Sequence, residues 1–160
     1  MTLEHGSTVH GMTCMTAQPA LIDTNIFGYV FDTREPEKQQ IAQDLLARCW
    51  RGETGYAVSM QNLAEFAVIV TEKVARPLPD ATVREFIKNI TAFDGWIKVG
   101  YSGDTIIEAV KIRSTYAIHF WDALLIATML EHGITTAYSE DRHLASVPVV
   151  HVINPFEGLA

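Results

Sequence analysis

Short apolar runs alternate along the chain with longer stretches of helical periodicity. Runs of strand length occur at residues 20–22, 56–58, 96–99, 136–138 and 149–153. A helix is expected directly after Asp23, and apolar positions at helical spacing lie at about 36–51, from Ser59 or Gln61 toward 76, 80–92, 102–114 and 120–131. Strands separated by helices of ten or more residues require parallel crossovers. The pattern therefore predicts an α/β fold, a three-layer α/β/α sandwich with a central, mainly parallel five-stranded sheet.

Residues that start and stop helices agree with this division. Pro36 stands at a first-turn position, and Asp80 and Ser102 are expected to cap the helices that follow them. Gly52 and Gly133 lie just beyond two of the predicted helices, where a left-handed residue often ends a helix.

Length and composition predict a single folded domain. The chain has 160 residues, of which 48% are hydrophobic and 19% charged, as in globular proteins. We expect residues 1–18, which lack an apolar core, to form a flexible tail, and residues 19–157 to form the domain.

The cellular setting is inferred from what the chain lacks. Its most apolar run, residues 123–130, is much shorter than the ~20 residues of a membrane span, so no membrane association is expected. Cys14 and Cys49 have neither metal-site spacing nor the density of a disulfide-rich protein. A cytoplasmic location is the expectation.

Four acidic residues occupy positions that parallel sheets use for binding sites. Asp23 ends the first predicted strand, and Glu65 lies in the first turns of the helix that follows the second strand. Asp122 begins a strongly apolar helix, and Asp141 follows the fourth strand. Ligands of such sheets bind beyond the carboxyl ends of the strands. Each acid alone is as well explained as a turn or helix-dipole residue.

The apolar surroundings of Asp23 and Asp122 favour a functional reading, because a solvated acid has little reason to lie there. Two carboxylates ~4 Å apart repel by about 4 kcal/mol at an effective dielectric of 20, so a group of four must bind cations or protons. Oxygen ligands without His or Cys suit Mg²⁺, with Mn²⁺ as the alternative. Paired cations of this kind hydrolyse phosphodiesters. A net charge of −7 disfavours binding of nucleic acid, but bound cations would make the site locally positive and attract a phosphate.

Four stretches, in order and spacing, resemble the PIN-domain ribonucleases, in particular the VapC toxins of bacterial toxin–antitoxin pairs. These are LIDTNIF (21–27), SMQNLAEF (59–66), FWDALLIA (120–127) and YSEDRHL (138–144), followed by VINPF (152–156). The resemblance spans about residues 20–156. The chain departs from it at His119, where many relatives have Ser, and after Asp141, where a Gly is often found.

The resemblance implies that the four acids bind the metal and carry out catalysis, with Asn25 and Ser139 beside them. It further implies an endoribonuclease acting on RNA such as tRNA, inhibited by a small cognate antitoxin, and a homodimer.

Other polar residues are auxiliary candidates. Glu140 adjoins Asp141, and the family spacing favours Asp141 as the site acid. Arg113, nine positions before Asp122, is a candidate phosphate contact, although a solvated cation near a helix end is the commoner role. His119 is a weaker candidate for proton transfer.

Several alternatives stay open. One is a PIN-like RNA-binding or scaffold module with little catalysis. An aspartate-based phosphatase would use Asp23, but that class has a second Asp where this chain has Asn25. The aromatic residues Trp50, Phe66, Phe86 and Trp121 lie at helical spacing typical of the core, with a partner's groove as the other reading.

Overall fold

The structure is a computed structural model that describes residues 18–159. Within them a five-stranded sheet has the order β3-β2-β1-β4-β5, and all neighbouring strands are parallel. The strands are β1 (Ala20–Ile22), β2 (Tyr56–Ser59), β3 (Trp96–Val99), β4 (Thr136–Tyr138) and β5 (His151–Ile153). The predicted fold class is confirmed, and the sheet expected to be mainly parallel is parallel throughout. The predicted tail falls largely on residues 1–17, outside the described part.

The predicted helices are present with ends shifted by no more than a few residues. They are α1 (Thr24–Val30), α2 (Pro36–Trp50), α3 (Met60–Val68), α4 (Asp80–Ala92), α5 (Gly103–Tyr116) and α6 (Phe120–Glu131). The structure adds a π-helical turn, η1 (Ile69–Lys73), that continues α3, and a short helix, α7 (Arg142–Ala145). The helix predicted from Ser59 or Gln61 toward 76 includes η1, although its π form was not predicted. The short helix α7 was missed, because four residues have too little periodicity to detect. The expected capping role of Asp80 is wrong: it is the first helical residue, and its side chain caps nothing.

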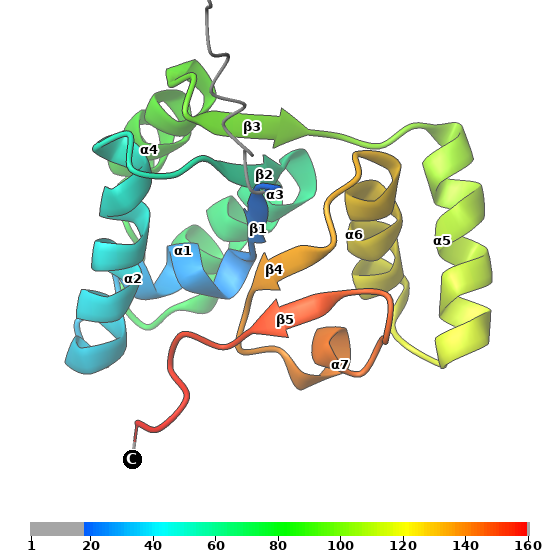
Figure 1. Ribbon diagram of the computed structural model, residues 1–160. Coiled ribbons are helices and arrows are strands. Elements are labelled where there is room, and N and C mark those ends of the chain that lie inside the picture. Colours follow the sequence, from blue (N-terminus) through cyan, green and yellow to red (C-terminus); the bar gives the residue numbers. More distant parts are fainter. Residues whose placement is uncertain (1–17, 160) are drawn as a thin grey trace, which may run out of the picture.

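The helices cover both faces of the sheet, as expected for a three-layer sandwich. In Figure 1, α1, α2 and α4 lie on the left of the strands, and α5 and α6 on the right. The two cores follow the alternation of strand side chains. Leu21 packs with the α5–α7 layer, whereas its neighbour Ile22 packs with the α1–α4 layer.

Helix α6 lies between the sheet and α5 (Figure 1). This position explains its composition, since seven consecutive residues, Ala123–Met129, are buried. Gly133, with φ +69°, follows the helix as predicted. None of the helices in residues 18–159 combines the length and apolar character needed to cross a bilayer.

The strand order places a crevice between β1 and β4. The chain leaves β1 for β2 through the α1–α2 layer, whereas β4, on the other side of β1, is reached through α5 and α6. Helices therefore diverge at the carboxyl ends of β1 and β4, which is where open parallel sheets bind ligands. Asp23 and Ser139 are the first residues after these two strands.

Candidate functional site

The four acids proposed from the sequence line one pocket at this crevice. Asp23 follows β1, Glu65 lies in α3, Asp122 in the first turn of α6, and Asp141 directly before α7. The pocket has a volume of about 170 Å³. Segments up to 118 residues apart therefore bring their carboxylates to a single mouth.

Asp23 is the most enclosed of the four, with 8% of its surface exposed. Its Oδ1 accepts hydrogen bonds from the backbone N–H of Thr24 (2.7 Å) and from Nδ2 of Asn62 (3.1 Å). Its Oδ2 accepts from Oγ of Ser139 (2.6 Å) and Nδ2 of Asn25 (3.2 Å). Burial nevertheless raises the pKa of Asp23 to about 6, outweighing the hydrogen bonds that lower it. The charges of Glu65 and other site acids add to the increase.

Glu65 is fixed by residues from two elements. Its Oε2 accepts a hydrogen bond from Oγ1 of Thr24 (3.1 Å), and its Oε1 accepts from Nε2 of Gln61 (2.9 Å). Gln61 also donates to the backbone carbonyl of Trp121 (2.9 Å), which ties α3 to α6. Two buried amide oxygens that line the pocket, Oε1 of Gln61 and Oδ1 of Asn25, have no hydrogen-bond partner among the described residues.

Asp122 and Asp141 complete the pocket from the other layer. Asp141 caps α7 by accepting from the backbone N–H of His143 (2.8 Å), and its own N–H donates to Oγ of Ser139 (2.9 Å). Asp122 is half-buried and accepts no hydrogen bond from residues 18–159. Burial, and then the charge of Asp141, raise the pKa of Asp122. Its carboxylate is the one most open to a new ligand.

Asn62 is a site residue that the sequence argument missed. Fully buried, it donates from Nδ2 to Asp23 and to Oγ1 of Thr24 (3.0 Å), while its Oδ1 accepts from Oγ of Ser59 (2.8 Å). It thereby joins the start of α3 to the end of β1. The available signal was its place three residues after Ser59, the spacing of a capping box at the start of a helix.

The auxiliary candidates differ in where they lie. Asn25 and Ser139 contact Asp23, as the resemblance implied. Glu140 faces away from the pocket, where it pairs with Nζ of Lys38 (2.7 Å) and accepts a hydrogen bond from the Tyr29 hydroxyl.

Two further candidates, Arg113 and His119, are not among the described residues that line the pocket. Arg113 is exposed in the last turn of α5. His119 is exposed at the N-cap position of α6, and its ring lies 6.0 Å from that of His143.

The pocket lining offers carboxylate and amide oxygens without His or Cys, a donor set that suits a hard divalent cation. A bound cation would offset the mutual repulsion of the carboxylates. It would also favour the ionised forms of Asp23 and Asp122, whose pKa values are raised. As it stands, residues 18–159 contain no group of three or more His, Cys, Asp or Glu side chains arranged to hold an ion. Mg²⁺ is usually held by one or two carboxylates together with waters and substrate oxygens.

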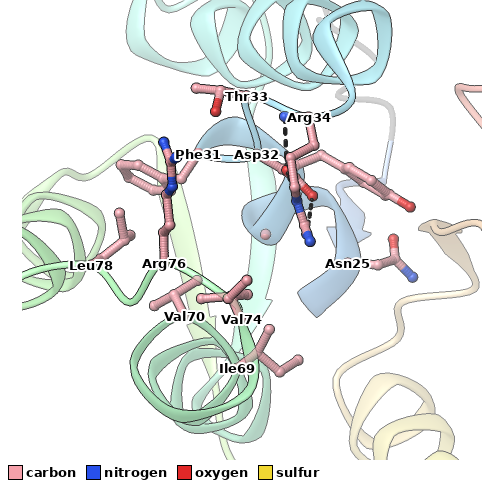
Figure 2. A pocket seen from close by; sticks show the side chains of 13 residues that line it. Asn25, Phe31, Asp32, Thr33, Arg34, Ile69, Val70, Val74, Arg76 and Leu78 are labelled. Carbon is pink, nitrogen blue, oxygen red and sulfur yellow. Dashed lines mark hydrogen bonds and ion pairs between the residues drawn. The ribbon is translucent and has the colours of Figure 1, made fainter.

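A larger pocket of about 500 Å³ adjoins the acid pocket between α1 and η1. The two pockets share Asn25 and Ile69. Figure 2 shows the apolar side chains of η1 and the following loop on one side, with Arg34 opposite them and Arg76 beside Phe31. Arg34 is paired with Asp32 (2.9 Å). An occupant of this larger pocket would therefore lie directly beside the acids.

Solved structures with the same fold include proteins of toxin–antitoxin systems. A toxin–antitoxin complex from Klebsiella pneumoniae superposes with a TM-score of 0.59 at 22% identity, covering 86% of this chain and 98% of that one. VapC20 of Mycobacterium tuberculosis, a toxin that cleaves the sarcin–ricin loop, gives 0.61 at 17% identity over 83% and 98%. FitAcB from Neisseria gonorrhoeae gives 0.58 at 16% identity over 86% and 99%. These likenesses show the fold.

Comparison with curated protein sequences gives no match. The family model of the PIN domain matches residues 20–150. That range runs from β1 to the residue before β5 and contains all four acids with Asn25, Asn62 and Ser139. The sequence match and the shared fold agree, and the chain belongs to the PIN domain family.

Proposed function

We propose that the chain is a divalent-metal-dependent endoribonuclease that hydrolyses RNA phosphodiester bonds at the acid pocket. The observation that carries the proposal is the convergence of Asp23, Glu65, Asp122 and Asp141 on one mouth at the carboxyl end of the sheet. Membership of the PIN domain family and the fold shared with an RNA-cleaving toxin support it.

Each acid has a role that follows from its contacts. Asp23 and Glu65 are held by hydrogen bonds that leave little freedom, so they define where a cation would bind. Asp122 lacks such bonds and is free to adjust to the cation and its waters. Mg²⁺, or Mn²⁺ in its place, would supply the positive charge that draws a phosphate to this acidic site and favours ionisation of an attacking water.

The deciding experiment compares cleavage of RNA by the purified chain and three single variants. Asp23→Asn and Asp122→Asn are expected to lower the cleavage rate by at least 100-fold. Asp94→Asn, a change at an exposed acid outside the pocket, is expected to cleave like the wild type. Circular dichroism checks that all variants fold. Chelator should stop the reaction and Mg²⁺ restore it. Wild-type rates in both site variants, or cleavage indifferent to chelator, would refute the proposal.

We further propose that the chain is the toxin of a VapBC-type pair, with a small antitoxin as its partner. The known toxin–antitoxin complexes of this fold support this part. The pocket between α1 and η1 is where such a partner would block the site most directly, since it shares residues with the acid pocket. Expressing the chain alone should arrest bacterial growth, and Asp23→Asn should not. Structured RNA, with tRNA as a first substrate, is the target to test.

We propose that the chain forms a homodimer through the exposed apolar face of α5. Ile106, Ile107 and Val110 lie one helical turn or less apart and are 39%, 59% and 49% exposed. An apolar cluster of this kind on a helix marks an association surface. Light scattering should give twice the monomer mass for the wild type and the monomer mass for Ile107→Glu. A wild-type monomer at high concentration would contradict the dimer.

A further inference from the structure

Trp121 has a surface position that its sequence surroundings did not predict. Its spacing in an apolar run indicated a core residue, yet 59% of the side chain is exposed. It lines the acid pocket and directly precedes Asp122. A tryptophan this exposed leaves a large apolar face in water, and here that face stands at the edge of a highly charged pocket.

Trp121 is restrained both at its backbone and at its ring. Its backbone carbonyl accepts the hydrogen bond from Nε2 of Gln61, the same nitrogen that holds Glu65. Its ring meets Phe120 edge to face, with centroids 5.6 Å apart and an interplanar angle of 69°. Phe120 packs on the core formed by α5, α6 and the sheet. A flat aromatic surface is therefore held at a set position relative to the acids.

The pocket that Trp121 lines also contains a buried hydrogen-bond acceptor without a partner, the amide oxygen of Gln61. Only 8% of the surface of Gln61 is exposed, and its Oε1 has no hydrogen-bond partner among the described residues. Turning the amide over would not help, because both partners of its nitrogen, Oε1 of Glu65 and the carbonyl of Trp121, are acceptors. A hydroxyl or water of a bound ligand can satisfy this oxygen. The pocket that Trp121 lines therefore offers a ligand both an aromatic surface and a free hydrogen-bond acceptor.

We propose that Trp121 is a stacking platform for an unpaired RNA base whose neighbouring phosphate occupies the acid pocket. The inference rests on the proposed ribonuclease function and names the part of the substrate that the site recognises. Unpaired bases stack on aromatic side chains with little dependence on sequence, and each such contact contributes about 5- to 150-fold in affinity. A chain with net charge −7 gains little from general phosphate attraction, so an uncharged contact of this kind matters more here.

The test uses the full chain and a fluorescein-labelled single-stranded RNA of mixed sequence. Fluorescence anisotropy is measured with Ca²⁺, which takes the same oxygen ligands, and gels confirm that the RNA stays intact during the measurement. Trp121→Ala should weaken binding about tenfold and raise KM by a similar factor with kcat nearly unchanged. Trp121→Phe should retain most of the affinity. Tyr101→Ala removes an exposed aromatic residue outside the pocket and should bind like the wild type.

A second RNA, with abasic nucleotides in place of single bases, separates stacking from other contacts. One abasic position should weaken binding by the wild type but have little further effect on Trp121→Ala, since the partner of the missing base is already gone. Binding of intact RNA should also quench tryptophan fluorescence in the wild type more than in Trp121→Ala.

The outcomes separate the two proposals. Trp121→Ala binding and cleaving RNA like the wild type would overturn the stacking platform and leave the nuclease intact. If that variant instead loses binding of a protein partner only, Trp121 is a protein contact and the platform is likewise overturned. A wild type that neither binds nor cleaves RNA would overturn both.

Discussion

Ser139 donates a 2.6 Å hydrogen bond to Oδ2 of Asp23, although 116 residues separate them in the chain. The bond joins the residue after β4 to the residue after β1, across the crevice where the two helical layers diverge. The same hydroxyl accepts from the backbone N–H of Asp141. One buried side chain therefore sets two of the four acids relative to each other.

Ser139→Ala should destabilise the protein and shift its activity to higher pH. The bond to a buried carboxylate contributes about 1.5–3 kcal/mol, and because it lowers the pKa of Asp23, removing it raises that pKa further. Urea unfolding and pH–rate profiles with Mg²⁺ measure the two effects. Ser146→Ala, at an exposed serine that bonds only the backbone carbonyl of His143, is the control and should change neither. An unshifted profile in Ser139→Ala would contradict the coupling.

Asp23→Asn should abolish cleavage and remove the pH dependence that this buried carboxyl gives to the stability of the metal-free protein. The pKa of Asp23 rises on folding from 3.8 to about 6, so the folded state holds a proton that the unfolded state releases. Stability due to this group is complete below about pH 4 and declines as the pH rises to about 6, by about 3 kcal/mol.

An asparagine does not titrate, so Asp23→Asn should lose this decline between pH 4 and 7. Chemical unfolding in chelator, at several pH values, measures it. Added Mg²⁺ should restore stability to the wild type at pH 7 and have no such effect on the variant. A wild type that grows steadily more stable from pH 4 to 7 without metal would show that the proton linkage is absent.

Glu140 and Asp141 form a matched pair of neighbouring acids with opposite orientations. Asp141→Asn should lower cleavage at least 100-fold, because this side chain lines the pocket. Glu140→Gln should keep near wild-type cleavage. It weakens the ion pair with Lys38, whose partly exposed groups contribute at most about 1 kcal/mol to stability. Cleavage rates of the two variants test this prediction. A larger loss in Glu140→Gln than in Asp141→Asn would mean that the pocket reorganises when a cation binds.

Asn62→Ala should cost about 2–3 kcal/mol of stability and lower activity as well. The change removes one of the two hydrogen bonds to Oδ1 of Asp23 and the side-chain acceptor of the Ser59 hydroxyl, both of them buried. Unfolding curves measure the first effect, and Mg²⁺ titrations of the cleavage rate, which should need more metal, measure the second. Asn89→Ala, at an exposed position of α4, is the control. Equal stability of the two variants would mean that Asn62 is not the link between α3 and β1.

The fold class and the candidate acids follow from local patterns in the amino-acid sequence. Strands read as short apolar runs, helices read from their periodicity and caps, and parallel connections followed from the length of the crossovers. Asp23 and Asp122 stood out because an acid within an apolar run needs a reason. These signals are local in the chain, so one sequence was enough to detect them.

The neighbours that surround the acids and the directions of adjacent side chains depend on contacts between distant segments, which the three-dimensional structure reveals. Glu140 and Asp141 cannot be separated by periodicity, and their directions depend on Lys38 from α2 and on the short helix α7. The role of Asn62 and the exposure of Trp121 likewise depend on how α3 and α6 meet at the end of the sheet. Contacts between segments far apart in the chain leave no periodic trace in it, since they arise only when the strands have set the layers in place.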